Sequence, residues 1–439
     1  MAENEVTIVG AGLAGCEAAH FLAKHGIRVR LADIKPKKFT PAHSSEKLAE
    51  LVCSNSLKSN DVFGNACGLL KEEMRRLGSL IIAAADATRV PAGGALAVDR
   101  EAFSAYITDA IAHEENIEYV CEEAERIPAG YAIVATGPLT QGALAEDIQK
   151  RLGGNLAFYD AAAPIVSAQS IDYAHTFVAD RYGKGGGDYV NCPLTREEYE
   201  AFVEALIAAE RAEQHAFDKR DVFEGCMPVE IMASRGKDTL RFGMLKPVGL
   251  YDENGKRPYA VLQLRKENLA GTAYNLVGFQ TNLKFSEQKR VFSMIPALKN
   301  AEFLRYGVMH RNTFLNGPQV LAPDSSLKED GKVFFAGQIT GVEGYVESAA
   351  SGLLAAASCA LKLRGEQPVV WDARTVCGAL LRHISAPNED FQPMNANYGV
   401  LEPLAEHVRD KALKKKMLAE RSLARIGEIA AEIEEKLRA

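Results

Sequence analysis

The beginning of the chain passes from an apolar run through glycines into an amphipathic stretch. Val6–Val9 is short, apolar and rich in β-branched residues, as in a buried strand. Gly10–Gly15 follows at once with the spacing GxGxxG, and Cys16–His25 has the apolar spacing of a helix. Ile27–Leu31 then alternates as a second strand and leads to Asp33. The pattern predicts a β–α–β unit with a tight glycine turn after its first strand.

Further elements of the same kind follow this unit. The pattern predicts a short helix from Ser44 to Leu51, a helix from about Cys67, a helix through Ile111, and strands at Glu118–Val120 and Tyr131–Val134. The helix from Cys67 carries apolar residues on one face at Leu70, Met74, Leu77 and Ile81, a stripe typical of core packing. The alternation of strands and helices indicates an α/β domain.

The texture changes from about Asn155, which indicates an inserted domain. Thr195–Glu198 has the form of a capping box at the start of a long helix. From about Tyr274 the chain is expected to rejoin the first domain, with a strand at Lys332–Phe335 and a helix at Val346–Leu361. We therefore expect a first part over 1–155, an insertion over 156–275, and a second part over 276–439 that ends in charged amphipathic helices.

Composition narrows the class of protein. The chain has 439 residues, which is too long for one core, and its charged fraction of 25% is that of ordinary globular proteins. No apolar run approaches the ~20 residues of a membrane span, and no signal peptide precedes the first strand, so we expect a cytoplasmic protein. The 8 cysteines lack CxxC spacing, which argues against a metal site and against a disulfide framework. With a net charge of −7, any nucleic-acid contact needs a local basic patch.

The glycine turn predicts a dinucleotide site. Gly10 makes the tight turn, Gly12 lets the backbone approach a pyrophosphate, and Gly15 lets the helix pack closely on the strand. The helix N-terminus offers N–H groups and a positive dipole to the phosphates, and Asp33 stands where a carboxylate accepts from a ribose hydroxyl. An ordinary tight turn would also satisfy a bare GxGxxG, but here the strand, helix and acid are all in place.

Two cysteines occur in unusual surroundings. Leu51–Asn60 contains Cys53 among hydroxyls, amides and Lys58, where neither helix nor strand is favoured, and so suits a loop that lines a ligand site. Cys226 lies in a turn between Gly225 and Met227-Pro228 with carboxylates on both flanks. A polar surface turn and a buried inert cysteine are the plain alternatives.

A stretch of the insertion mixes cations with aromatic rings. The cations are Arg235, Lys237, Arg241, Lys246, Arg265 and Lys266, and the rings are Phe242, Tyr251 and Tyr259. Such a mixture fits an RNA-binding surface, although solvated strand faces explain most patterns of this kind.

The chain resembles the folate- and FAD-dependent tRNA uracil-5 methyltransferases over essentially its whole length. The resemblance rests on Gly10–Gly15, Leu51–Asn60, Asp188–Pro193, Gly225–Pro228, Tyr306–Thr313 and Gly337–Tyr345. The only departure is Asp33, where the family often has glutamate. The resemblance implies an α/β fold: a Rossmann-like FAD-binding domain of the glutathione-reductase type, interrupted by an α+β insertion domain.

The resemblance also implies an activity and a set of partners. Methylenetetrahydrofolate would give a carbon to C5 of the T-loop uridine (position 54) of tRNA, reduced FAD would give the electrons, and NAD(P)H would reload the flavin. The residues expected to bind the cofactor are Gly10, Ala11, Gly12, Leu13, Ala14, Gly15, Asp33, Thr136, Gly137, Gly337, Gln338, Gly344 and Tyr345. His310 and Arg311 are candidates for the folate, and a structural histidine is an equal alternative. The protein would be a monomer or a homodimer.

The chemistry explains why two cysteines belong beside a flavin. Uracil C5 is a poor nucleophile until a thiolate adds to C6, and a second group must then take the C5 proton. We assign Cys226 as the nucleophile and Cys53 as the acid/base partner, and the reverse assignment stays open.

Four other functions compete with this one. The flavoprotein that modifies the wobble uridine of tRNA shares the glycine fingerprint and a cysteine loop, but usually has a long C-terminal helical extension. A relative that methylates ribosomal RNA has no distinguishing sequence feature. A flavin-dependent disulfide reductase or NADH oxidase would place its redox cysteines in CxxxxC-like spacing, which Cys16, Cys53 and Cys67 do not show. A non-catalytic RNA-binding flavoprotein would leave both thiols without a role.

Overall fold

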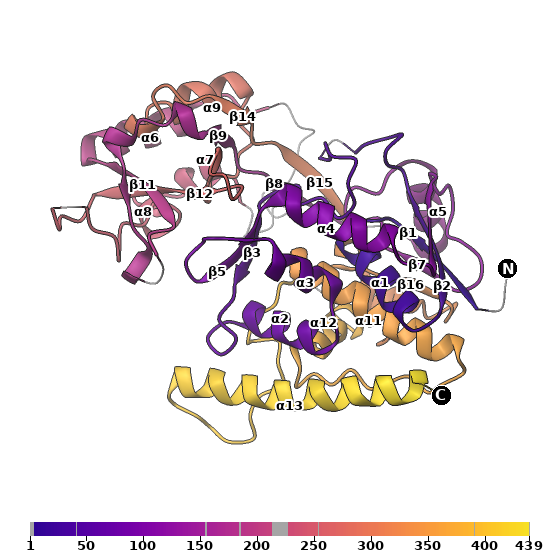
Figure 1. Ribbon diagram of the computed structural model, residues 1–439. Helices are drawn as coiled ribbons and strands as arrows, with labels where there is room; N and C mark the ends of the chain where they lie inside the picture. Colours follow the sequence, from indigo (N-terminus) through magenta and orange to yellow (C-terminus); the bar gives the residue numbers. More distant parts are fainter. Residues whose placement is uncertain are drawn as a thin grey trace.

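Strands from both ends of the chain form one five-stranded parallel sheet (Figure 1). The computed structural model describes residues 4–40, 42–153, 156–183, 186–212, 227–252, 254–389 and 391–438. The order of the strands is β16 (Val333–Phe335), β7 (Ala132–Val134), β1 (Glu5–Val9), β2 (Arg28–Asp33) and β6 (Ile117–Cys121). Ile8 lies opposite Leu31 on β2 and Ile133 on β7, and all three side chains are buried. This burial explains why the strands read as nearly continuous apolar runs.

Helices and a small antiparallel sheet surround the parallel sheet. The helices are α1 (Leu13–Lys24), α2 (Ala66–Arg76), α3 (Leu80–Ala87), α4 (Arg100–Ala112), α5 (Gly142–Leu152), α10 (Gly317–Val320), α11 (Tyr345–Leu363), α12 (Val376–Ser385) and α13 (Lys411–Arg438), with a 3₁₀ turn η7 (Gln338–Thr340). The small sheet has the order β3 (Ser56–Ser59), β5 (Ala95–Val98) and β4 (Arg89–Val90). Helices α1 and α11 pack so closely that a Cβ added at Gly352 would lie 2.2 Å from the carbonyl oxygen of Ala14. The predicted α/β class is confirmed.

Two local predictions were wrong. The helix predicted from Ser44 to Leu51 is an irregular loop, in which the Glu50 carboxylate accepts hydrogen bonds from the backbone N–H groups of Ser44 and Ser45. The single helix predicted from Cys67 is two helices. The first ends at Arg76, and Gly78, with a φ of +76°, redirects the chain before the second begins at Leu80. Ser79 then caps α3 by accepting from the N–H of Ile82.

The insertion is built on a six-stranded antiparallel sheet. Its order is β10 (Phe177–Val178), β11 (Tyr189–Leu194), β12 (Ala260–Lys266), β13 (Ala273–Leu276), β9 (Ile165–Ser167) and β14 (Phe303–Arg305). Its helices are α6 (Arg196–Ala208), α7 (Val229–Ser234), α8 (Thr239–Phe242) and α9 (Phe285–Phe292), with 3₁₀ turns η1 (Ala168–Ser170), η2 (Tyr173–His175), η3 (Arg181–Gly183) and η6 (Pro296–Leu298). The predicted capping box is present, with reciprocal hydrogen bonds between Thr195 and Glu198 at the start of α6.

The antiparallel sheet and its core include residues beyond 275, the expected end of the insertion. Residues after 275, including Phe279, Phe292 and Leu298, belong to the buried core of the insertion, and β14 is the edge strand of its sheet. A two-stranded ribbon, β8 (Leu156–Ala161) with β15 (Met309–Phe314), lies between the two parts of the molecule (Figure 1). We therefore propose that the insertion extends to Arg305, where the sequence pattern had indicated residue 275.

Two helices from the C-terminal part of the chain, α11 and α13, pack into the core of the domain with the parallel sheet. Helix α13 runs along one side of the molecule (yellow in Figure 1) and buries Leu418, Ile426 and Ile433. Among the described residues, α11 is the one helix with the length and hydropathy of a membrane span, a possibility that the search for long apolar runs missed. Because 89% of the apolar stretch of α11 is buried inside the protein, α11 is accounted for as a core helix.

Candidate functional site

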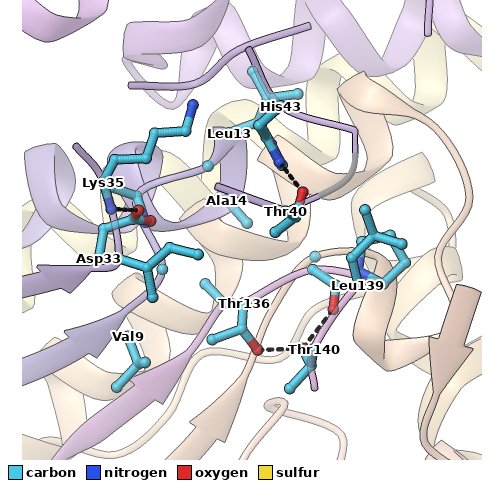
Figure 2. Close-up of a pocket in the computed structure, with 18 of the residues that line it drawn as sticks. Val9, Leu13, Ala14, Asp33, Lys35, Thr40, His43, Thr136, Leu139 and Thr140 are labelled. Carbon is cyan, nitrogen blue, oxygen red and sulfur yellow. Dashed lines mark hydrogen bonds between the residues drawn. The ribbon is translucent and has the colours of Figure 1, made fainter. Parts of the chain in front are cut away.

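A pocket opens at the carboxyl ends of the parallel strands. Its walls come from the ends of all five strands and the turns that follow them: Gly10–Ala14 at β1, Asp33–Lys35 at β2, Glu122–Ala124 at β6, Ala135–Gln141 at β7, and Gly337–Gln338 at β16. Tyr345 and Ser348 from the first turns of α11 complete one wall. Figure 2 shows Asp33, Thr136 and Thr140 around this pocket, with the two threonine hydroxyls 2.6 Å apart. Ligands of open parallel sheets bind at this edge.

The glycines of the first turn create the shape that a pyrophosphate needs. A Cβ added at Gly10 would lie 2.5 Å from the carbonyl oxygen of Ala135, and one added at Gly15 would lie 1.7 Å from the carbonyl oxygen of Gly10. A Cβ added at Gly12 would meet no atom within 4 Å. Gly10 and Gly15 thus allow close packing, whereas Gly12 borders free space at the N-terminus of α1. This cradle fits a dinucleotide cofactor such as FAD.

Asp33 closes the turn from the other side. Its carboxylate accepts from the backbone N–H of Ala11 at 2.6 Å and from that of Lys35 at 3.0 Å (Figure 2). The remaining lone pairs leave it able to accept from a ribose hydroxyl. Beside it, the Lys35 ammonium pairs with the Glu50 carboxylate at 2.9 Å. Burial alone would raise the pKa of Glu50, but the hydrogen bonds from Lys35 and the Ser44 N–H outweigh burial and lower it.

The loop that carries Cys53 is fastened to the start of α11. The Tyr345 hydroxyl oxygen accepts from the backbone N–H of Cys53 at 2.6 Å and from that of Ser54 at 3.1 Å. Burial raises the pKa of Tyr345, and so does the neighbouring Cys53, which keeps the phenol neutral. Tyr345 also lines the pocket, so one side chain joins the predicted cofactor site to the predicted cysteine loop.

Charged groups from both parts of the molecule surround the same loop. Arg100 at the start of α4 donates to the carbonyl oxygens of Leu51 and Cys53 and forms an ion pair with Glu267 of the insertion. Burial opposes the charge of Arg100, but Glu267 outweighs it and raises the pKa. Arg305 at the end of β14 belongs to the same electrostatic neighbourhood, where burial and repulsion by Arg100 lower its pKa.

Most of the other described cysteines are unsuited to thiolate chemistry. Burial is the largest cause that raises the pKa of the thiols of Cys16, Cys67, Cys192, Cys359 and Cys377. Cys53 and Cys121 are the partly exposed cysteines among the described residues. The described residues also contain no group of three or more His, Cys, Asp or Glu side chains that could hold a metal ion. Cys53 therefore stands out by its exposure and its anchored loop.

Comparisons with known proteins agree with this geometry. A family model described as glucose inhibited division protein A matches residues 5–367. The methylenetetrahydrofolate–tRNA-(uracil-5-)-methyltransferase TrmFO of Acetivibrio thermocellus is 57% identical over 422 residues, which cover 95% of this chain and 97% of the relative. The protein of the same name from Geobacter sulfurreducens is 58% identical over 425 residues, covering 96% and 98%. The chain belongs to the TrmFO family.

A solved structure supports the fold of this TrmFO family member at greater distance. Aquifex aeolicus GidA superposes with a TM-score of 0.72 and covers 100% of this chain, but only 16% of residues are identical. At that identity the likeness concerns the fold alone. The chain covers 74% of the GidA chain, whereas it covers nearly all of its TrmFO relatives. The recognition of the family from sequence motifs is confirmed.

The structure places most of the expected cofactor residues around the one pocket. Those in its lining are Gly10, Ala11, Gly12, Leu13, Ala14, Asp33, Thr136, Gly137, Gly337, Gln338 and Tyr345. Gly15 supports the turn from behind, and Gly344, with a φ of +120°, is the N-cap of α11. Whether these residues bind FAD in this TrmFO family member stays a prediction.

The second half of the expected site is only partly described. Cys226 lies outside the described residues. His310 and Arg311 lie on β15, paired through the backbone with Asp160 and Tyr159 of β8, but their side chains are outside the description. The roles of these three residues stay predictions.

Sequence reasoning missed several residues that shape the site. Lys35 and Glu50 were assigned to a polar loop and a helix, and no sequence signal indicated that they pair. Arg100 was overlooked, although it directly follows Asp99, the residue that caps α4 in the structure. The link from Tyr345 to the Cys53 loop spans 292 positions, and no local pattern reports so distant a contact.

Proposed function

We propose that this protein methylates C5 of a uridine in tRNA, with 5,10-methylenetetrahydrofolate as the carbon donor. The names of the TrmFO relatives support the substrate and the folate. The proposed target is the T-loop uridine at position 54. One structural observation carries the proposal: the backbone of Cys53 is held by Tyr345, a residue that also lines the predicted dinucleotide pocket.

The pocket residues would hold FAD in a defined orientation. The free space at Gly12 and the N-terminus of α1 would receive the pyrophosphate, and Asp33 would accept from the adenosine ribose. Gly337 and the N-terminus of α11 would face the flavin end. Bound FAD would supply the two electrons that convert a methylene carbon to a methyl group, and NAD(P)H is proposed to restore those electrons.

The thiols and their neighbours would act on the uracil ring. A cysteine thiolate adds to C6, which pushes electron density to C5 and lets C5 bond to the folate carbon. A base then takes the C5 proton while the carbon–nitrogen bond to the folate breaks and tetrahydrofolate leaves, and the thiolate leaves C6 once the methylene carbon has become a methyl group. We propose Cys226 as the nucleophile and Cys53 as the acid/base group, with His310 and Arg311 on the folate. The protein would act as a monomer or a homodimer.

The first test replaces each thiol separately. Purified wild-type protein should be yellow and should transfer the folate methylene carbon to unmodified tRNA when NADPH is present. Cys53→Ala and Cys226→Ala should each lower turnover by at least about a hundredfold while FAD stays bound, because an acid/base group contributes roughly 10²–10⁴-fold and no C6 adduct forms without the nucleophile. Cys121→Ala, at another partly exposed cysteine, is the matched control and should keep full activity.

The second test identifies the RNA. Mass mapping of tRNA and ribosomal RNA from a strain that lacks this gene should show loss of 5-methyluridine at position 54 of tRNA. Loss from ribosomal RNA would transfer the activity to the other substrate. If both thiol variants methylate at the wild-type rate, the assignment of the cysteines is wrong.

A further inference from the structure

Strand β12 of the insertion has two different faces, and both are covered. Ala260, Leu262 and Leu264 point into the apolar core of the insertion. The alternate positions carry Gln263 and Arg265, of which Arg265 is only 6% exposed. A guanidinium is rarely buried to this extent unless partners satisfy it. The partners of Arg265 therefore indicate what this polar face does.

Arg265 binds the loop that carries Cys53. Its Nε donates to Asn55 Oδ1 at 2.9 Å, and its Nη2 donates to Ser54 Oγ at 2.7 Å. Asn55 is fully buried and donates in turn to the carbonyl oxygens of Val98 and Lys266, each at 2.9 Å. The two residues that follow Cys53 are thus joined to the insertion by three hydrogen bonds, which all involve Arg265 or its neighbour Lys266.

Opposing anchors hold Cys53 between them. Tyr345 accepts from the N–H groups of Cys53 and Ser54 on the side of the cofactor pocket. Arg265 holds the side chains of Ser54 and Asn55 on the side of the insertion. Because both anchors act within two residues of the thiol, a change at either one alters the position of the sulfur.

We propose that Arg265 is a positioning residue, which fixes the Cys53 thiol relative to the cofactor pocket and does not contact the RNA. The proposal rests on the proposed function only in assuming that Cys53 takes part in methyl transfer. It also replaces both interpretations drawn from the sequence for Arg265, an exposed RNA-binding stretch and a solvated strand face. The planar guanidinium suits this task, because two of its N–H groups reach two acceptors at fixed spacing.

Three variants separate this role from general damage to the insertion. Arg265→Met removes both hydrogen bonds and keeps most of the side-chain volume. Arg265→Lys keeps the charge but loses the planar pair of N–H donors. Arg181→Met is the matched control, since Arg181 donates to Gln263 on the same strand and to the carbonyl oxygen of Val248, without reaching the Cys53 loop. For each variant we would measure FAD content, kcat and KM for tRNA, and alkylation of Cys53 by iodoacetamide with peptide mass mapping.

The expected result is a selective loss of turnover. Arg265→Met should lower kcat by roughly 10- to 100-fold, because a misplacement of about 1 Å can cost 10²-fold, with FAD content and the KM for tRNA unchanged. Cys53 should be alkylated about fivefold faster, the population change that follows from losing about 1 kcal/mol of anchoring. Cys121 should be alkylated at the wild-type rate. Arg265→Lys should fall between Arg265→Met and the wild type, and Arg181→Met should resemble the wild type.

Other outcomes overturn the proposal. A higher KM for tRNA with unchanged kcat would make Arg265 an RNA contact. A loss of kcat equal to that of Arg181→Met, with unchanged alkylation of Cys53, would make it a structural residue of the insertion. If the wild type methylates no RNA, the proposed function fails, while the alkylation rates still decide whether Arg265 holds the loop.

Discussion

At the scale of single residues, the glycines of the first turn have two separate purposes. Gly15 is required by the protein itself, because its Cα faces the carbonyl oxygen of Gly10. Gly12 is not: its φ of −76° is open to any residue, and no atom of the described residues lies within 4 Å of a Cβ added there. A glycine that the fold does not need indicates a ligand that approaches the backbone closely.

Substitution by alanine tests this division. Gly12→Ala should fold as the wild type but bind FAD about tenfold more weakly, since a methyl group at the phosphate position is expected to cost about 1.4 kcal/mol. Gly15→Ala should fail to fold, because its Cβ would lie 1.7 Å from an oxygen atom. Flavin absorbance per protein and circular dichroism measure the two effects.

The control for this pair is Gly427→Ala on α13, where an added Cβ meets no atom within 4 Å. It should be neutral or stabilise by up to about 1 kcal/mol. Unchanged FAD affinity in Gly12→Ala would show that the phosphates lie elsewhere.

At the scale of elements, the sequence predicted those parts of the fold that local pattern determines. The unit β1–α1–β2, the capped helix α6 and the late strand β16 follow from periodicity and turn residues. The end proposed for the insertion does not, because the residues up to Arg305 join its sheet through pairing with β9, far back in the sequence. A strand's alternation gives its faces but not what covers them, so Arg265 looked like a solvated cation.

A buried carboxylate between two helices gives a prediction at the same scale. Glu17 on α1 accepts from Ser79 Oγ at 2.7 Å and from the N–H groups of Leu80 and Ile81 at 2.9 and 3.0 Å, at the start of α3. Burial raises the pKa of Glu17 to about 7, and the hydrogen bonds only partly offset burial. The folded protein therefore holds this proton more tightly than the unfolded chain does.

The sign of the pH dependence follows from linkage. The contribution of Glu17 to stability is fully present below its ordinary pKa of 4.5 and is lost as the pH rises through about 7. Glu17→Gln keeps the shape and one of the two acceptor oxygens but cannot ionise, and the loss of the second acceptor is the same at every pH. The difference in free energy of unfolding, variant minus wild type, should rise by on the order of 3 kcal/mol between pH 4.5 and 7. Urea unfolding at several pH values measures this, and parallel curves for the two proteins would refute it.

At the scale of the whole molecule, the loop that carries Cys53 lies where the insertion meets the domain of the parallel sheet. The covalent connection there is the β8–β15 ribbon, and the noncovalent one includes the ion pair between Arg100 and Glu267. The side chains of this pair are 17% and 6% exposed, so each charge depends on the other. Among the described residues, no group donates a hydrogen bond to Glu267 Oε1, which leaves Arg100 as the main stabilisation of that carboxylate.

A double-mutant cycle across this contact tests whether the two parts are energetically coupled. Arg100→Met and Glu267→Gln should each lower the free energy of unfolding by about 2–5 kcal/mol, since each leaves or weakens a buried charge. The double variant should lose clearly less than the sum, because neither charge is then left alone. Arg151→Met, which breaks surface pairs with Glu329 at 2.9 Å and Asp330 at 3.0 Å, should cost less than about 1 kcal/mol.

The same cycle, followed by turnover, reaches the chemistry. Arg100 also donates to the carbonyl oxygens of Leu51 and Cys53, so its loss should lower kcat even in the double variant, whereas Glu267→Gln acts on the loop only through Arg100. We therefore expect the two Arg100 variants to share one low kcat and Glu267→Gln to lie between them and the wild type. Additive stability losses would mean that Arg100 and Glu267 are not energetically coupled. Full activity in Arg100→Met would mean that this contact does not position the Cys53 loop.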